Sequence, residues 1–215
     1  PAPSAGQPSV LLICYGIDRA NQMDGSIEDW NKFERLTPFR VREVLLIASQ
    51  FDRYLLEESG HLAEILQEEY SDLNMSQAPR IIHSPDPDDA IELVSARKFD
   101  LVITMSKVGK MNVFDLANKL KGIDAKLPVV MLSPNTRELA TLKTGEGIDR
   151  IFVWSGDSRI LLSICKLIED EKNVENDVRE GDVQVILLVE DSRRFYSAYL
   201  PLLYTQLVNQ TSRLS

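Results

Sequence analysis

Cysteine, histidine and long apolar runs are scarce in this sequence, and each shortage narrows the class of protein. The 215 residues include two cysteines, Cys14 and Cys165, which lie far apart in apolar contexts with no CxxC motif and no neighbouring histidine. This usage is typical of buried free thiols in a cytoplasmic protein. No apolar run approaches the about 18 residues that a membrane helix requires, so we expect no membrane contact.

Basic residues and glycine-rich loops are also too few to support nucleic-acid coating or nucleotide binding. With 24 Lys and Arg against 33 Asp and Glu, the formal net charge is −9. Such a balance argues against a protein whose main task is to coat nucleic acid, because phosphate binding depends on clustered cations. The sequence contains neither a GxGxxG motif nor a GxxxxGKS or GxxxxGKT motif, so nucleotide binding has no support.

The two histidines do not indicate a metal site. His61 follows Glu58 in a Glu-x-x-His spacing, but a di-iron site needs a second such pair, which the sequence lacks. We therefore interpret His61 as part of a solvated helix face. His83 has only Asp86 nearby and is expected in an exposed loop after the second strand.

From residue 41 onward, short apolar runs alternate with amphipathic stretches. The runs are continuous, which indicates strands covered on both faces, and the stretches have the three- and four-residue apolar spacing of helices. Five β-α units in succession predict an α/β fold with a flavodoxin-like, doubly wound, five-stranded parallel sheet. The predicted strands are 44–47, 81–82, 101–103, 129–132 and 151–153, and the predicted helices are 52–70, 87–97, 113–121, 135–142 and 157–172.

The same pattern divides the chain into four parts. These are an N-terminal extension at 1–40, the α/β domain at 41–172, a charge-dense linker at 173–182 and the start of a truncated second domain at 183–215. In the extension, residues 10–15 are a candidate strand and residues 26–36 a candidate short helix. We leave open whether that strand extends the sheet or substitutes for a strand of the truncated second domain.

The last part holds an apolar run at 183–189 and an amphipathic stretch at 192–214. Pro201 is expected to interrupt or kink the helix in this stretch, unless it marks a new helical start. When the first strand of the α/β domain is aligned in sequence with the run at 186–189, Ala48 corresponds to Glu190. This similarity indicates two copies of one fold in series.

The string Ile-Leu-Leu-Val-Glu-Asp-Ser at 186–192 resembles the first strand of response-regulator receiver domains. In that family an apolar strand ends in two acidic residues that hold Mg²⁺ beside a phosphorylated aspartate. The resemblance implies that Glu190 and Asp191 are metal ligands in a complete second receiver, whose phosphorylated aspartate lies beyond Ser215. The alternative is that the Glu-Asp-Ser string only caps the following helix.

Residues 41–172 resemble the same family over its full length, but the residues of its phosphorylation site differ. Met105 stands where the family has the phosphorylated aspartate, and Trp154 stands where it has a lysine. Ala48 and Ser49 replace the acidic pair, while Ser133 keeps the hydroxyl position. The sequence positions of this degenerate phosphorylation pocket are Ala48, Ser49, Met105, Ser133 and Trp154.

These departures predict a receiver that cannot be phosphorylated, that is not an enzyme and that needs no cofactor. A Met105 thioether cannot accept a phosphoryl group, and Ala48 and Ser49 cannot hold Mg²⁺. Asp52 and Asp100 remain nearby in sequence, but we interpret them as helix-start and strand-start residues rather than ligands.

A closer resemblance covers the strings at 36–46, 149–158 and 188–204. They are similar to the N-terminal regulatory region of large bacterial proteins whose later module is similar to phosphoenolpyruvate synthase and pyruvate phosphate dikinase. The resemblance implies that the parent polypeptide is a phosphotransferase whose catalytic residues lie outside this chain.

The function predicted from the sequence is therefore regulatory signal transduction of the receiver type, with no nucleic acid and no membrane involved. The first receiver acts by protein-protein interaction through its fourth and fifth strands and their helices, with a histidine kinase or the protein's own downstream domains as partner. An alternative is a small-molecule sensor with a pocket lined by Met105 and Trp154. The aromatic residues of 195–204 are expected to pack on the first domain or on another copy of the chain, giving a possible homodimer.

Overall fold

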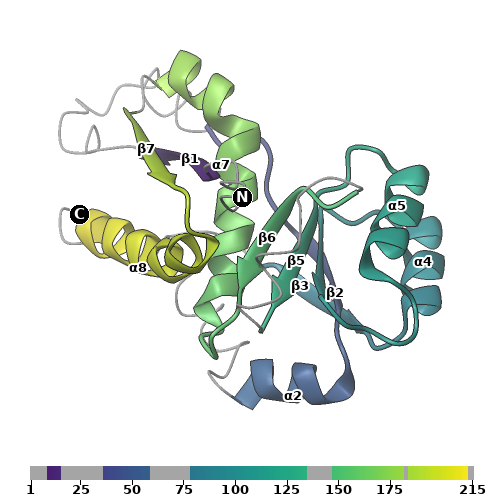
Figure 1. Cartoon of the computed structure of the whole chain (residues 1–215). Helices are drawn as coiled ribbons and strands as arrows, with labels where there is room; N and C mark the ends of the chain where they lie inside the picture. Colours follow the sequence, from purple (N-terminus) through teal and green to yellow (C-terminus); the bar gives the residue numbers. More distant parts are fainter. Residues whose placement is uncertain (1–8, 16–35, 59–77, 135–146, 182–183, 213–215) are drawn as a thin grey trace, which may run out of the picture.

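The structure, a computed structural model, describes residues 9–15, 36–58, 78–134, 147–181 and 184–212 (Figure 1). Its main body is a parallel sheet whose strands are β2 (Glu43–Ile47), β3 (Arg80–Ser84), β4 (Leu101–Met105), β5 (Val129–Ser133) and β6 (Arg150–Val153). The helices of this body are α2 (Gln50–Glu58), α4 (Pro87–Ala96), α5 (Val113–Ile123) and α7 (Arg159–Gly181).

The five strands lie in the order β3-β2-β4-β5-β6, and every neighbouring pair is parallel. The first strand of this sheet lies inside it, and the chain moves outward in both directions from there. This is the flavodoxin-like doubly wound order, so the predicted fold class is confirmed. Every residue of β4 and β5 is buried, as continuous apolar runs predict for central strands.

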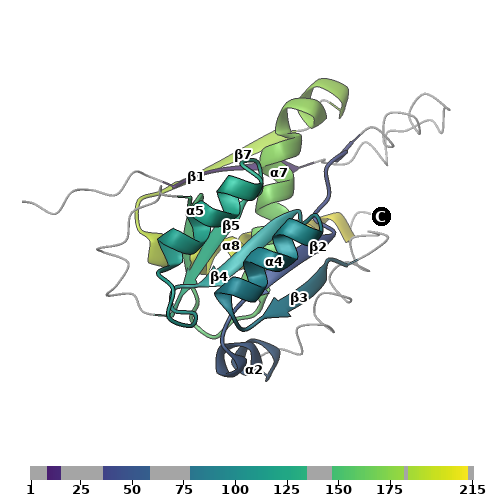
Figure 2. The same ribbon diagram turned by 90° about the vertical axis from the view of Figure 1, so that its right-hand side faces the viewer.

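Helices cover both faces of the sheet. Figure 1 shows α4 and α5 on one side and α7 on the other, and in Figure 2 α4 and α5 lie in front of the strands. Local sequence fixes two helix starts: the Asp86 carboxylate accepts the Asp88 N–H at 2.8 Å, and the Asn112 side chain accepts the Phe114 N–H at 2.8 Å. These caps satisfy backbone donors that have no partner within the helix.

Two predicted helices extend beyond the described residues. The helix predicted at 52–70 is seen as α2 up to Glu58, and its remainder lies outside the described part of the chain, as does the helix predicted at 135–142. The helix predicted at 26–36 also falls almost wholly outside it.

Of the residues predicted as a linker, 173–182, those at 173–181 are helical and continue α7 to Gly181, and residue 182 lies outside the described part of the chain. The reason is a set of three polar side chains on α7, the polar ladder, at a spacing of four residues. Glu169, Asn173 and Asp177 accept hydrogen bonds from the backbone N–H groups of Val41, Phe39 and Thr37 at 2.8, 2.9 and 2.8 Å. The Asn173 amide also donates to the Phe39 carbonyl at 2.8 Å. The sequence pattern predicts that these polar residues face solvent, but in the structure they are buried and bind the segment before β2.

A second, two-stranded sheet lies outside the main one. In it β1 (Ser9–Tyr15) pairs antiparallel with β7 (Gln184–Glu190), with Ser9 opposite Glu190 and Tyr15 opposite Gln184, and β1 lies against α7. The strand predicted at 10–15 is confirmed, and its partner is the strand of the last segment. The assignment of residues 183–215 to a second receiver, and the division into domains as a whole, stay predictions.

The last helix, α8 (Arg193–Ser212), is continuous through Pro201, where the sequence predicts an interruption or a kink. Tyr196, Leu200 and Tyr204 are buried at four-residue intervals on both sides of the proline. Their packing against β6 and α7 holds the helix together across the hydrogen bond that Pro201 cannot donate. Within the described part of the chain, none of the helices has the length and apolarity needed to cross a membrane.

Candidate functional site

The carboxyl ends of the parallel strands meet at one edge of the sheet, where binding sites of this fold lie. In the sheet register Ile47 is opposite Thr104, Met105 opposite Leu132, and Ser133 opposite Val153. This edge therefore gathers five residues that the sequence analysis singled out, which we call the strand-end site: Ala48, Ser49, Met105, Ser133 and Trp154. Four of them are almost wholly buried, with exposed fractions of 0% for Ala48 and Ser133, 2% for Met105 and 7% for Trp154.

Ser49 directly precedes α2 and caps the start of this helix. Its hydroxyl donates to the Asp52 carboxylate at 2.7 Å and accepts the Asp52 N–H at 3.1 Å, and its carbonyl accepts the Arg53 N–H at 2.9 Å. The Ser49 hydroxyl therefore caps the helix N-terminus, and Asp52 orients that hydroxyl. Asp52 is a helix-start residue, as predicted.

His83 joins the strand-end site, although the sequence places it in an exposed loop. It lies within β3 and is half-buried, with Nε2 2.7 Å from the Ala48 carbonyl oxygen. Because a carbonyl only accepts, Nε2 is the nitrogen that carries the proton in this contact. The sequence gives no signal for it, since the contact depends on the pairing of β3 with β2.

The indole of Trp154 is the unusual group of the site. Its backbone N–H donates to the Ser133 carbonyl at 3.0 Å, continuing the pairing of β5 and β6 by one residue. Its ring Nε1 is buried and has no hydrogen-bond partner among the described residues. A buried donor left without an acceptor costs about 1–3 kcal/mol, which makes this atom a candidate contact for a ligand or for water.

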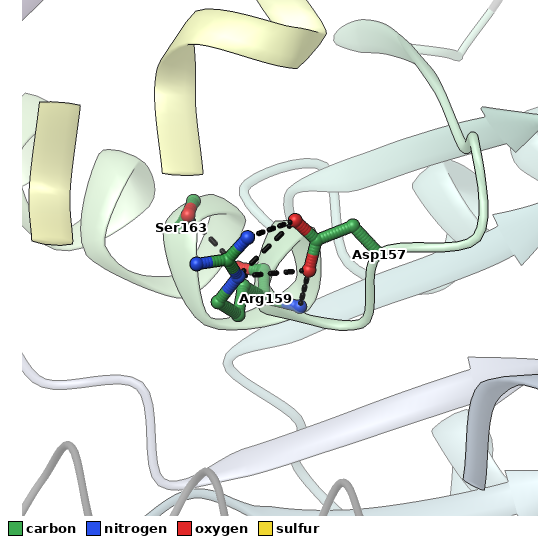
Figure 3. Close-up of polar contacts among 3 residues, drawn as sticks. All are labelled: Asp157, Arg159 and Ser163. Carbon is green, nitrogen blue, oxygen red and sulfur yellow. Dashed lines mark hydrogen bonds and ion pairs between the residues drawn. The ribbon is translucent and has the colours of Figure 1, made fainter. Parts of the chain in front are cut away.

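The first carboxylate after β6 is bound to a cation of its own chain. Figure 3 shows Asp157 and Arg159 facing one another at the start of α7, with Oδ2 of Asp157 2.7 Å from Nη2 of Arg159 and Oδ1 3.0 Å from its backbone nitrogen. Partial burial raises the pKa of Asp157, but these hydrogen bonds and the charge of Arg159 outweigh it and lower the pKa below its ordinary value. Ser163 donates to the Arg159 carbonyl at 2.9 Å. Asp157 therefore acts as a helix cap.

Asp100 lies at the opposite edge of the sheet. Its Oδ2 accepts the N–H groups of Arg42 and Glu43 at 2.8 and 2.9 Å, where β2 begins. The prediction that Asp100 is a strand-start residue is confirmed.

Glu190 and Asp191, the metal ligands implied for a second receiver, lie on β7 and directly after it, away from the strand-end site. The Glu190 carboxylate accepts the Ser192 N–H at 2.8 Å, and Asp191 is exposed. Among the residues that the structure describes, no group of three or more His, Cys, Asp or Glu side chains is placed to hold a metal ion. The two carboxylates alone are an incomplete donor set for Mg²⁺, which prefers six oxygen ligands. The metal assignment stays a prediction.

The edge strand β6 is covered by α8, an arrangement we call the α8 interface. The N–H of Val153 donates to the Ser197 hydroxyl at 2.8 Å, so a side chain of a helix satisfies the open edge of the sheet. The rings of Phe152 and Tyr196 stack with centroids 5.6 Å apart. The Tyr204 hydroxyl donates to Oδ2 of Asp170 on α7 at 2.8 Å.

The α8 interface confirms that part of the aromatic segment packs on the first domain. Tyr196 and Tyr204 are the buried members, and Phe195 and Tyr199 stack on one another at the surface with ring centroids 6.0 Å apart. Their exposed fractions are 49% and 46%. The homodimer stays a prediction.

Fold and site together define a flavodoxin-like α/β protein with an uncharged strand-end site. No family model matches the chain, and no curated protein matches it. Among solved structures, the chain is similar to the signal receiver domain of an HD domain-containing protein from Pseudomonas fluorescens Pf-5, with 20% identity over 65% of this chain and 94% of that one and a TM-score of 0.46. It is also similar to a CheY-like response regulator receiver domain from Methanospirillum hungatei JF-1, with 16% identity over 63% and 98% of the two chains and a TM-score of 0.47. A third such domain, from Methylobacillus flagellatus, has 16% identity over 60% and 98% and a TM-score of 0.45.

Proposed function

We propose that the chain is a regulatory signal-transduction module of the receiver type, whose first receiver is not phosphorylated and acts by protein-protein interaction. One observation supports this proposal: the five residues of the strand-end site lie at the carboxyl ends of the parallel strands and include no carboxylate and no amine. Four of these side chains are buried, and the Ser49 hydroxyl is engaged by Asp52.

The chemistry of phosphoryl transfer supports the same conclusion. An acyl phosphate needs a carboxylate nucleophile, and the Met105 thioether at the end of β4 cannot replace one. The transferring group also needs Mg²⁺ to neutralise its charge, and Ala48 and Ser49 at the end of β2 offer no carboxylate for the ion. We infer that residues 41–172 need no cofactor for their role.

Acetyl phosphate with Mg²⁺ tests the proposal directly. We expect the intact mass of the whole chain to stay unchanged after incubation, while a phosphorylatable receiver in the same tube gains one phosphoryl group. A stoichiometric phosphoaspartate mapped by peptide sequencing to residues 41–172 would overturn the proposal.

The partner in this proposal is a protein, either a histidine kinase or further domains of the same polypeptide. The face formed by β5, β6 and their helices is the proposed contact surface, and α8 already covers the β6 part of it. In the wider form of the proposal, Glu190 and Asp191 bind Mg²⁺ in a complete second receiver, and the whole polypeptide is a phosphoenolpyruvate- or pyruvate-utilising phosphotransferase that this chain regulates.

A small-molecule sensor is the second candidate function, and the orphaned indole nitrogen of Trp154 favours it. A ligand that offers a carbonyl oxygen at the strand-end site would accept this N–H and remove its energetic cost.

Fluorescence of Trp154 tests this candidate. Since Trp30 is the other tryptophan, the Trp30→Phe variant leaves Trp154 as the sole indole emitter. We expect menadione, as a quinone probe, to quench this emission saturably, and to do so less in a double variant that also carries Met105→Ala. Linear, unsaturable quenching in both variants would contradict a binding site.

A further inference from the structure

We propose that β7 is the pairing edge of a homodimer, in which the β7 strands of two copies of this chain lie antiparallel around Leu187 and form one four-stranded sheet. The proposal goes beyond the receiver-type function, because it concerns the sheet of β1 and β7 and not the strand-end site. It also differs from the dimer expected from the sequence, which the aromatic residues of 195–204 would form. It rests on the open edge of β7 and on an apolar pattern in this strand that reads alike in both directions.

One edge of β7 has no partner strand among the residues that the structure describes. β7 pairs with β1 over its whole length, from Gln184 to Glu190, and these two strands make up the entire second sheet. Because β1 makes most of the contact of this sheet with α7, β7 is its outer strand. The backbone N–H and C=O groups that β7 directs away from β1 can therefore bind a further strand.

Every second residue of β7 exposes an apolar side chain along this edge. The exposed fractions are 39% for Val185, 59% for Leu187 and 57% for Val189. The residues between them, Ile186 and Leu188, are partly buried and pack against the core. An exposed apolar strand with an open edge is a place where chains associate.

The edge strands of the main sheet, in contrast, are protected from such pairing. At β6 the Ser197 hydroxyl of α8 accepts the Val153 N–H at 2.8 Å. At the other edge, β3 is five residues long and begins with the exposed cation Arg80. β7 has neither kind of protection: it is seven residues long, it contains no lysine, arginine, proline or glycine, and its register with β1 runs without a bulge. A strand without these features is suited to pair at its edge.

The order of residues in β7 favours a second copy of the chain as the strand that pairs there. Antiparallel pairing around Leu187 places Leu187 opposite Leu187 of the second copy, and Val185 opposite Val189 of that copy. All three exposed apolar residues then meet apolar residues on the same face of the sheet. This pairing also keeps the two Glu190 carboxylates at opposite ends of the strand pair, about 20 Å apart at about 3.4 Å per residue. Parallel pairing in register would bring these like charges side by side.

The oligomeric state of the whole chain tests this proposal. We expect sedimentation velocity to show a mass that rises from the 24.3 kDa of the monomer toward twice that value as the concentration increases. Because one strand pair is a small interface, half of the chain should be dimeric at a concentration on the order of 100 µM. A chain that stays monomeric up to about 1 mM, or that forms open-ended assemblies without a dimer, would overturn the proposal.

Charge variants at position 187 test the register of the pairing. Leu187→Lys and Leu187→Glu each place two like charges opposite one another, so each should weaken the dimer at least about tenfold. An equimolar mixture of the two variants should restore the dimer, because opposite charges then face each other. The same two substitutions at position 185 are the control, because the residue opposite is Val189. A mixture of Val185→Lys and Val185→Glu should associate no more strongly than either variant alone.

A variant of α8 separates this dimer from one formed by that helix. Leu202 of α8 is 53% exposed, so Leu202→Lys adds the same charge at a similar exposure, and the dissociation constant should change by less than about twofold. Far-UV circular dichroism of every variant checks that the fold is kept.

Two further results would contradict pairing through β7. They are a loss of the dimer in Leu202→Lys as large as in Leu187→Lys, and a mixture of Leu187→Lys with Leu187→Glu that stays monomeric. None of these measurements depends on phosphorylation, so a failure of the dimer and a failure of the proposed function are distinguishable.

Discussion

Single residues at the ends of the strands determine what this fold can do. Met105 is buried at the end of β4, and the Ala48 carbonyl oxygen accepts a hydrogen bond from Nε2 of His83. Asp52 follows Ala48 and Ser49 closely in sequence, and Asp157 follows Trp154. Both carboxylates take part in helix caps. The side chains of the site are therefore hydroxyls, a thioether and an indole, with the imidazole of His83 beside them.

Another single residue, Gly147, lets the chain just before β6 pass close to the backbone of α5. Its φ is 87°, and a Cβ added there would lie 2.7 Å from the Ala117 carbonyl carbon and 2.8 Å from the Asn118 nitrogen. We expect Gly147→Ala to lower the free energy of unfolding by about 2 kcal/mol or more, because both the backbone conformation and the contact oppose a side chain. Urea denaturation measures this change.

Gly122 is the matched control in the same region. It lies in α5, and a Cβ added to it would meet no atom within 4 Å. Gly122→Ala should raise the free energy of unfolding by up to about 1 kcal/mol, from helix propensity alone. Equal losses in the two variants would contradict the packing argument for Gly147.

At the scale of elements, α7 follows the last strand of the five-stranded sheet and binds the segment that precedes its first strand. Through the polar ladder it binds the segment before β2 much as a neighbouring strand would. The acceptor side chains lie at every fourth residue of α7, and the N–H donors lie at every second residue of that segment. Thr37 has a φ of 52°, a conformation that favours glycine, and the bond from its N–H to Asp177 helps to hold it there.

Asn173 is the ladder member whose loss is most informative, because it binds both the N–H and the carbonyl of Phe39. We expect Asn173→Ala to lower the free energy of unfolding by about 2 kcal/mol, since two backbone groups lose their partner. Glu175→Ala, an exposed position on the same helix, should change it by less than about 0.5 kcal/mol. If chemical denaturation gave similar free energies of unfolding for the two variants, the ladder would contribute nothing to stability.

The sequence predicts elements better than contacts between them. The five apolar runs become the five strands, because fully buried strands leave a clear local pattern. The ladder has no such pattern: Asn173 and Asp177 look like linker residues until their partners about 130 residues away are placed. The pairing of β1 with β7 and the contact of His83 with Ala48 depend in the same way on tertiary structure. For Pro201, packing overrides a local rule that holds for an isolated helix.

The whole molecule is a five-stranded α/β unit with an added layer of β1, β7 and α8. This layer is apolar on its outer side too, since Val185, Leu187 and Val189 of β7 are more than one-third exposed. In this layer α8 lies over the edge strand β6.

The polar ladder also bears on the time course of folding. Its four hydrogen bonds join residues 128, 134 or 140 positions apart, and such contacts close long loops and form late. An interaction absent from the transition state leaves the folding rate unchanged and slows unfolding. Asn173→Ala should therefore shorten the lifetime of the folded state, with little effect on how fast that state is reached.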